Sequence, residues 1–262
     1  MSKFKRISIT IIGHNEVDHL SELLPDLEWA DEIIYVDCES SDESVKIAKA
    51  HNCSVFQRPN NPNLNINKSF AMEQAEGEWI FYLDPDERIP EQLAEEILAR
   101  IQNPQDNMAF YVNRRNHYFG KWLRHGSQYP DRQLRLFKRG HGQFPQQHVH
   151  ERIEIDGKIG QMKHNLYHYP YQSISQYLSK FDFYTSFEAD FLYRQGIHPG
   201  WFQSMRFLIS KPITRFIRRY LLKAGFRDGW QGFFAAIFDS LNYAVRYFKL
   251  MEQLSREDEK NQ

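Results

Sequence analysis

Short apolar runs and helical spacings alternate along the first hundred residues of the chain. Four runs have the length and the β-branched or aromatic content of buried strands, at residues 7–12, 33–36, 54–57 and 78–83. Between and after them, apolar residues recur at helical intervals, at residues 17–28, 43–51, 68–75 and 90–102. Strands that alternate with helices predict right-handed crossovers and a mainly parallel sheet, so we expect an α/β fold.

Polar side chains follow three of these strands at the point where each strand ends. Asn15 and Glu16 follow the first strand, Asp37 the second, and Asp84 with Asp86 the fourth. Ligands of open α/β sheets bind outside the carboxyl ends of the strands, and two acids one residue apart can hold a hard cation that bridges a diphosphate. The alternatives are that the acids begin the following helix, and that Asp37 caps a helix or occupies a loop.

The loop after the first strand argues against several nucleotide-binding classes. It contains a single glycine, Gly13, and matches neither the P-loop nor the dinucleotide fingerprint, which disfavours kinase-like and dehydrogenase-like functions. A nucleotidyltransferase would also use strand-end acids and a metal. The Gly-rich and Lys- or Arg-rich first loop of that class is missing here.

The pattern changes after residue 108. Strand-like pieces at 109–113, 133–138 and 151–155 are predicted to complete the sheet and to close over a site, so residues 1–172 form the expected catalytic domain. Residues 173–262 are predicted to be a helical C-terminal region. An aromatic stripe at its start is expected to be core, at Tyr177, Phe181, Tyr184 and Phe187.

Charge is distributed unevenly, although the formal net charge of −1 indicates no general affinity for nucleic acid. Residues 201–249 carry nine Lys and Arg against two acids. Because residues 201–223 are also aromatic and amphipathic, we expect them to contact an anionic membrane surface; the alternative is that their apolar face packs on the catalytic domain. The two cysteines, the lack of a signal sequence and the lack of a long apolar run predict a cytoplasmic protein, peripheral to the membrane.

Several motifs together resemble the family 2 inverting glycosyltransferases. They are Asn15-Glu16 after the first strand, residues 30–37, residues 67–71 and the Asp84-Pro85-Asp86 stretch. Residues 129–137, Val149-His150-Glu151 and residues 225–230 are similar to the bacterial subgroup that includes lipopolysaccharide core β-glucosyltransferases. The resemblance extends over residues 6–250 and implies a GT-A (Rossmann-like) nucleotide-sugar-binding domain.

The resemblance implies roles for the strand-end residues. Asp37 would contact the uridine, with Asn15 and Glu16 lining the same pocket and Lys68 a basic contact near the nucleotide. Asp84 and Asp86 would form an Asp-x-Asp motif, in which Asp86 binds Mg2+ or Mn2+ and Asp84 touches ribose or metal. Glu87 is expected to be only a first-turn acid of the next helix.

The resemblance also implies a catalytic base. Inversion requires a group that takes the proton of the acceptor hydroxyl, and Glu151 is our candidate, although a structural salt bridge with an arginine is the alternative. Arg132 and Arg135 suit the acceptor or diphosphate side, and solvated or core-pairing arginines are the alternative. A zinc site is a further alternative, with His148, His150, His164 and His168 as its ligands. No cysteine joins these histidines, and their spacing fits no common zinc site. One of these histidines can instead complete the shell of the catalytic metal.

Two departures from the family pattern bear on donor preference. Glu39 occupies a turn where relatives commonly have glycine, and Gly13-His14 differs from the usual residues before Asn-Glu. We therefore predict a metal-dependent inverting glycosyltransferase that moves glucose from UDP-glucose to a lipopolysaccharide inner-core sugar, a glycolipid acceptor, at the cytoplasmic face of the inner membrane. The alternatives are a glycosyltransferase for another cell-surface glycan and a non-catalytic carbohydrate- or membrane-binding scaffold, which retention of Asp84, Asp86 and Glu151 argues against.

Overall fold

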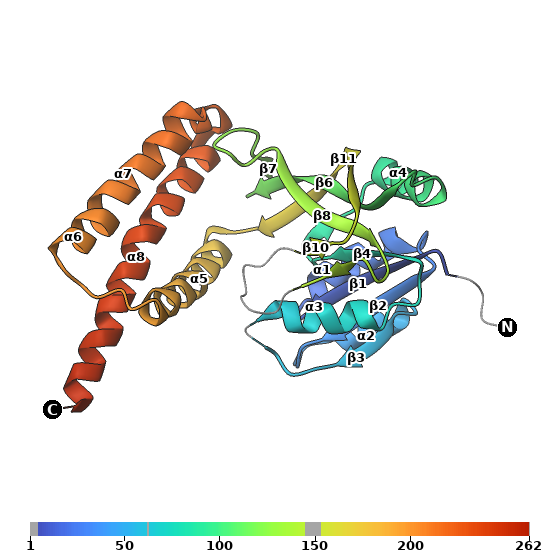
Figure 1. The fold of residues 1–262 in the computed structure, drawn as a ribbon, viewed down its shortest axis with the longest axis horizontal. Helices are drawn as coiled ribbons and strands as arrows, with labels where there is room; N and C mark the ends of the chain where they lie inside the picture. Colours follow the sequence, from blue (N-terminus) through green and yellow to red (C-terminus); the bar gives the residue numbers. More distant parts are fainter. Residues whose placement is uncertain (1–4, 62, 145–152, 262) are drawn as a thin grey trace. The chain divides into compact units, whose positions relative to one another are not determined.

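The computed structural model describes residues 5–61, 63–144 and 153–261, which form two compact units (Figure 1). The first unit comprises Met1–Arg114 with Asp131–His168, and the second Arg115–Pro130 with Tyr169–Gln262. The predicted division at residue 172 stays a prediction. The compact units group residues 115–130 with the helical part of the chain.

The first half of the main sheet is parallel, as the sequence predicts. Its strands are β1 (Ile7–Gly13), β2 (Glu32–Asp37), β3 (Ser54–Gln57) and β4 (Trp79–Leu83), in the order β3-β2-β1-β4. The connecting helices are α1 (Val17–Leu23) with η1 (Leu24–Leu27), α2 (Ser44–Ala50) and α3 (Leu64–Glu73). The predicted alternation of strands and helices, and with it the GT-A α/β fold class, is confirmed.

The second half of the sheet is antiparallel, so the sheet as a whole is mixed. After β4 the order continues β8 (Asp131–Lys138), β6 (Asn107–Tyr118), β11 (Lys158–Tyr171) and β5 (Glu87–Arg88), while β7 (Lys121–Trp122) pairs with β6. A separate pair joins β9 (Gly142–Gln143) to β10 (Glu154–Ile155). Helix α4 (Glu91–Gln102) lies between β5 and β6 in the chain.

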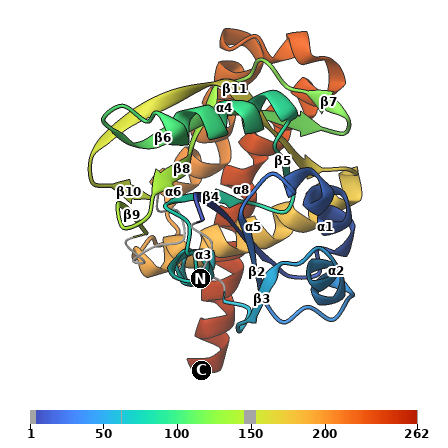
Figure 2. The same cartoon turned by 90° about the vertical axis from the view of Figure 1, so that its right-hand side faces the viewer.

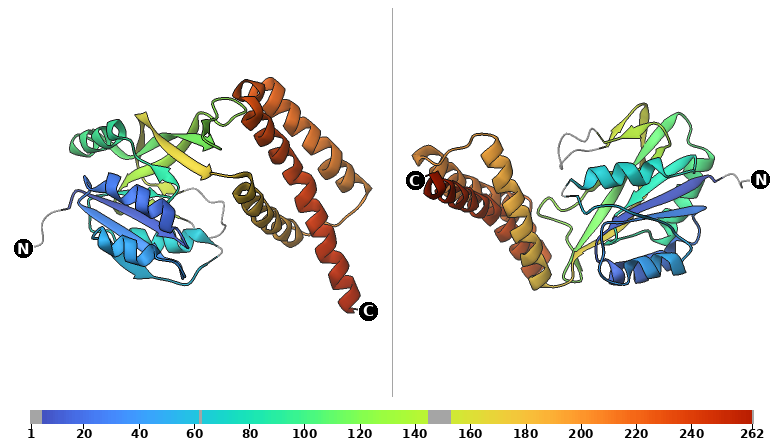
Figure 3. Two further views of the ribbon diagram at one scale, coloured as in Figure 1. Left: turned by 180° about the vertical axis from the view of Figure 1, so that it is seen from behind. Right: turned by 90° about the horizontal axis from the view of Figure 1, so that it is seen from below.

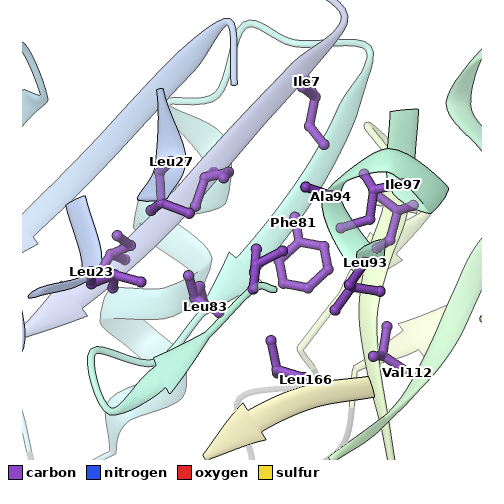
Figure 4. Packing of buried hydrophobic residues seen from close by; sticks show 14 of the residues in the cluster. Ile7, Leu23, Leu27, Phe81, Leu83, Leu93, Ala94, Ile97, Val112 and Leu166 are labelled. Atoms are coloured by element: carbon purple, nitrogen blue, oxygen red, sulfur yellow. The ribbon is translucent and has the colours of Figure 1, made fainter. Parts of the chain in front are cut away.

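The three inner parallel strands, β1, β2 and β4, are buried on both faces, which explains why their sequences are mostly apolar. On one face, Ile9 and Phe81 pack with residues of α1, α2 and α4 such as Leu23 and Leu93 (Figures 2 and 4). On the other face, Val36 and its neighbours pack with α3. The carboxyl ends of the parallel strands thus lie together at one edge of the sheet, where each strand is followed by a loop.

The second unit is mostly helical and also contains β7. Its helices are α5 (Ile174–Arg194), α6 (Trp201–Ser204), η2 (Met205–Ser210), α7 (Lys211–Phe216), η3 (Ile217–Leu222), η4 (Gly225–Asp228) and α8 (Gly229–Asn261). Helices α5 and α7 each pack along α8 (Figures 1 and 3). Tyr177 is buried as predicted, but Tyr184 is 48% exposed, so its assignment to the core is wrong. The buried row of α5 continues instead through Thr185, Ala189 and Leu192, because Ala189 and Leu192 lie on the side that packs with Tyr247 and Leu250 of α8.

No helix within the described parts of the chain combines the length and the apolarity that crossing a membrane requires.

Candidate active site

The register of the parallel strands brings the predicted polar residues to one edge. Gly13 lies opposite Asp37, and Ile11 lies opposite both Tyr35 and Leu83, so the three strands end at nearly the same level. The chain moves from β1 to β2 on one side, and β4 lies on the other. Strand order therefore reverses at β1, and such a switch point opens the crevice in which α/β proteins bind ligands.

Asp37 has an oxygen that is ready to accept a hydrogen bond. The residue is 1% exposed, and Oδ2 accepts a bond of 3.3 Å from the backbone N of Ser40. Oδ1 is buried and, among the described residues, has no hydrogen-bond donor. The helix-capping alternative does not describe Asp37. At the start of α2 it is Asp42 that accepts a hydrogen bond from the backbone N of Ser44, at 3.0 Å. A buried acceptor without a donor is costly, so a ligand that donates here would be bound favourably.

Asn15 and Glu16 help to shape the loop at this edge. The side-chain oxygen of Asn15 accepts hydrogen bonds from the backbone N of Ser41 at 2.8 Å and of Asp42 at 3.3 Å. The backbone N of Glu16 donates to Ser44 Oγ at 2.9 Å. These bonds tie the loop after β1 to the loop after β2. Their predicted contacts with a nucleotide remain predictions.

Glu39 adopts the left-handed backbone conformation, which favours glycine. Its φ is 60°, a region that costs a residue with a side chain on the order of 1 kcal/mol. Its Oε2 accepts a hydrogen bond of 3.1 Å from the backbone N of Asn60. The side chain thus joins the loop after β2 to the loop after β3, which a glycine could not do.

Asp84 lies in a dense ion-pair network. Its Oδ1 is 2.8 Å from Lys68 Nζ on α3, and its Oδ2 is 2.7 Å from Arg135 Nη2 on β8. Arg135 Nη2 also lies 2.5 Å from Glu87 Oε1, to which Arg114 Nη1 donates at 3.2 Å. Both oxygens of Asp84 therefore already contact cations, which favours Asp86 over Asp84 as a metal ligand.

The expectation for Glu87 is wrong. Glu87 lies in β5 and is fully buried, whereas α4 begins at Glu91. Its Oε2 accepts a hydrogen bond of 3.1 Å from the backbone N of Asp84. Glu87 therefore holds the turn that presents the two aspartates, and its charge is balanced by Arg135 and Arg114.

A β-bulge directs Arg135 into this network. Phe110 of β6 pairs with Leu136 and Tyr111 with Leu134, so Arg135 has no opposite residue on β6. A bulge re-aims the side chain it carries. The Arg135 side chain is 2% exposed, and its guanidinium carbon lies 4.2 Å from the centre of the Tyr82 ring.

Arg132 does not join the acid cluster. Its guanidinium lies 4.6 Å from the centre of the Tyr111 ring, and its Nε donates to Gln161 Oε1 at 3.0 Å. The structure thus separates the two arginines that the sequence grouped. The predicted role of Arg132 on the acceptor side stays a prediction, and the alternative of a core-pairing arginine describes Arg135.

The pKa values of the central pair reflect these contacts. Burial alone would raise the pKa of the Asp84 carboxyl, but Lys68 and Arg135 outweigh it and hold that pKa well below its usual range. Burial alone would lower the pKa of Lys68, but Asp84 keeps it above the ordinary value. Both groups are charged at neutral pH.

Asp86 and His168 form the best candidate for a metal-binding pair. Asp86 Oδ1 lies 3.5 Å from His168 Nε2, which brings a carboxylate from the turn after β4 next to an imidazole of β11. Oxygen and imidazole nitrogen both suit Mn2+ and related cations. Across the described ranges no group of three or more His, Cys, Asp or Glu has the arrangement of a metal site. The two side chains would supply two ligands to a divalent cation at this edge of the sheet.

The zinc alternative gains no support from the described histidines. His164 Nδ1 lies 2.9 Å from Glu96 Oε2, while His168 approaches Asp86. His148 and His150 lie outside the described residues, as does Glu151, the predicted base.

Sequence reasoning missed Glu87 and Arg114 as members of the site. A signal was present for Arg135, which stands between Leu134 and Leu136 in an otherwise apolar strand segment, whereas Arg114 lies in a polar run and gave none. A charge inside such a segment needs a buried partner, and the nearby acids were the candidates.

Comparison with known proteins places the chain among glycosyltransferases. Residues 8–159 match the model of the family described as Glycosyl transferase family 2. An uncharacterized glycosyltransferase of Rickettsia typhi is 28% identical over 260 residues, which cover 95% of this chain and 87% of that protein. The lipopolysaccharide core biosynthesis glycosyltransferase LpsC of Rhizobium meliloti is 27% identical, over 88% of this chain and 86% of that protein. Among solved structures, residues 1–349 of S. aureus TarS align over 98% of this chain and 92% of that chain, with 14% identity and a TM-score of 0.48.

Proposed function

Because the chain belongs to glycosyl transferase family 2 and is a glycosyltransferase, we propose that it transfers glucose from UDP-glucose to a lipopolysaccharide inner-core sugar, with inversion at the sugar carbon. The similarity to LpsC supports an acceptor of the lipopolysaccharide core. Another cell-surface glycan is the alternative acceptor. The transfer is a single displacement, in which the acceptor hydroxyl attacks the anomeric carbon and the diphosphate departs.

The buried Oδ1 of Asp37 is the observation that supports a nucleotide donor most directly. A base N–H or a ribose hydroxyl can supply the hydrogen bond that this oxygen lacks among the described residues. Asn15 and Glu16 line the same pocket in this proposal. Lys68 and its partner Asp84 lie at the edge where the ribose and the diphosphate would follow.

Asp86 and His168 would hold Mg2+ or Mn2+, with Asp84 beside them. When bound, the cation would neutralise charge on the departing diphosphate. Arg135 and Glu87 position Asp84 and the turn that carries Asp86. Arg132 is proposed for the acceptor side.

Glu151 is the proposed base that takes the proton of the acceptor hydroxyl. A positioned base contributes about 10²–10⁴-fold to such a step. Glu151→Gln should therefore lower the rate of transfer by that factor and leave the affinity for UDP unchanged. We further propose that the enzyme works in the cytoplasm, peripheral to the inner membrane where its glycolipid acceptor resides.

Calorimetric titration with UDP and Mn2+ tests the donor site. Asp37→Asn keeps the shape of the side chain but removes its charge, so the affinity should fall by about 10- to 100-fold, as expected for a hydrogen bond to a charged group. The exposed Asp26, changed to Asn, is the matched control and should bind as the unmodified protein does.

UDP release from a panel of UDP-sugars with a lipid-core acceptor tests the reaction itself. We expect release with UDP-glucose, and near-complete loss in Asp86→Ala. Wild-type rates in both Asp86→Ala and Glu151→Gln would refute the assigned roles. Absence of UDP binding and release with every donor would instead favour the non-catalytic scaffold.

A further inference from the structure

An exposed apolar row runs along the helical segment 201–222. It consists of six side chains spaced four residues apart: Trp201, Met205, Ile209, Ile213, Ile217 and Leu221. Their exposed fractions range from 40% for Met205 to 80% for Trp201. Apolar side chains that are exposed singly are common, but a continuous row of this length marks an interaction surface.

The winding of the backbone keeps this row straight. An ideal α-helix has 3.6 residues per turn, so side chains four residues apart drift around the axis by about 40° at each step. Here the α-helical α6 and α7 alternate with η2 and η3, which have π-helical i→i+5 bonding and hence wider turns. The wider turns offset the drift. The row thus stays on one side of the segment from Trp201 to Leu221.

The opposite side of the segment is already occupied within the helical unit. Phe207 is 2% exposed, and its ring stacks on Tyr247 of α8 with centroids 5.1 Å apart. Arg219 Nε lies 2.9 Å from Asp239 Oδ2, and Arg215 pairs with the same carboxylate. Since this inner side anchors the segment on α8 (Figure 3), the exposed row is not needed to hold the helices together.

Charge beside the row identifies the partner. The neighbouring line of exposed positions holds Arg206 and Arg218, and Lys223 and Arg227 are exposed just beyond the segment. Between residues 191 and 238 the sequence contains one acid, Asp228. It is 3% exposed and accepts hydrogen bonds from the backbone N and the ring of His125. The exposed surface here therefore combines apolar side chains with positive charge.

From these observations we propose that the row of Trp201 to Leu221 inserts into the interfacial region of an anionic bilayer, with the flanking cations on lipid phosphates. An amphipathic helix of this kind buries its apolar side about 5–10 Å into the headgroup and acyl boundary. A second copy of the chain is a poorer partner, because a two-fold contact would bring the arginines of both copies together. The proposal extends the proposed function, whose acceptor is a glycolipid, by naming the surface that meets the membrane.

Binding of the full-length protein to sedimented vesicles tests the proposal. The vesicles contain phosphatidylethanolamine with phosphatidylglycerol, and phosphatidylcholine vesicles are the neutral comparison. The combined change Ile213→Gln and Ile217→Gln should weaken binding by at least about tenfold, because the bound state loses the favourable free energy of moving two half-exposed apolar side chains from water into the bilayer. The matched control is Leu241→Gln with Phe248→Gln, which are comparably exposed on α8, and it should bind like the unmodified protein.

A second pair of substitutions tests the basic side chains beside the row. Arg206→Gln with Arg218→Gln should weaken binding to the anionic vesicles by about 10- to 30-fold, with little effect on the weak binding to neutral ones. Binding should also fall as salt is raised. Circular dichroism melts of all variants check that the helices remain folded.

Three results would overturn the proposal. The isoleucine variant could bind vesicles as tightly as the unmodified protein, or the control variant could lose as much. Light scattering without lipid could also find a dimer that only the isoleucine variant dissociates, which would assign the row to a second copy. UDP binding and UDP release measured without vesicles separate this from the enzymatic function, since the row variants should keep both.

Discussion

Substitution of Glu87 by glutamine is the sharpest test of the buried network. The change keeps the shape of the side chain and removes one negative charge from a site that is fully buried. Arg135, 2.5 Å from Glu87 Oε1, and Arg114, at 3.2 Å, would each lose a charged partner. Removal of one partner from a buried ion pair costs about 3–5 kcal/mol, because the remaining charge stays desolvated.

That cost is a large part of the stability of an ordinary protein, which is about 5–15 kcal/mol. Urea unfolding followed by circular dichroism should show it as a midpoint lower by about 1–2 M, for a dependence of roughly 2–3 kcal/mol per M. Glu91→Gln is the control, because Glu91 is the exposed acid that does occupy the first turn of α4. Loss of its favourable interaction with the helix dipole should cost only about 0.5 kcal/mol.

A double-mutant cycle identifies the partner of the lost charge. In Glu87→Gln with Arg135→Met, both members of the closest pair become neutral, so the double variant should be more stable than the sum of the single effects predicts by at least about 1 kcal/mol. The reasoning is refuted if Glu87→Gln unfolds at the same urea concentration as Glu91→Gln. It is also refuted if the two changes at Glu87 and Arg135 are simply additive.

Two further outcomes follow from the contacts. Because the pKa of Asp84 is depressed in the folded protein, its carboxylate stabilises the fold above the ordinary carboxyl pKa of about 3.9, and this stabilisation is lost as the pH falls through the folded pKa. Asp84→Asn should therefore flatten the pH dependence of the free energy of unfolding, measured in urea, between pH 5 and 2. An unchanged slope would contradict this reasoning. Phe207→Ala should lower the free energy of unfolding by about 3–5 kcal/mol in thermal melts, whereas Phe202→Ala, at 69% exposure, should change it by less than about 0.5 kcal/mol.

Local sequence was sufficient for the parallel half of the sheet. The run from Ile7 to Ile12 is rich in isoleucine and buried on both faces, as a strand between two helical layers requires, and the polar residues after it end the strand. The same reasoning located Asp37 and Asp86 at one edge, because parallel strands bring their carboxyl ends together. The buried Oδ1 of Asp37 adds a physical reason for a ligand there.

Tertiary structure decided which of these acids pair with cations. The proximity of His168 to Asp86 depends on β11, which follows β4 by more than seventy residues and pairs with the short β5. The direction of Arg135 depends on a bulge in β8, which no propensity encodes. Glu87 looked like a helix-start acid because its near neighbours in the chain fit that role. Charges that are far apart in the sequence offset each other's desolvation cost only after the fold has brought them together. The sequence alone therefore specified the residues at the strand ends, and the tertiary contacts specified the ion-pair network behind them.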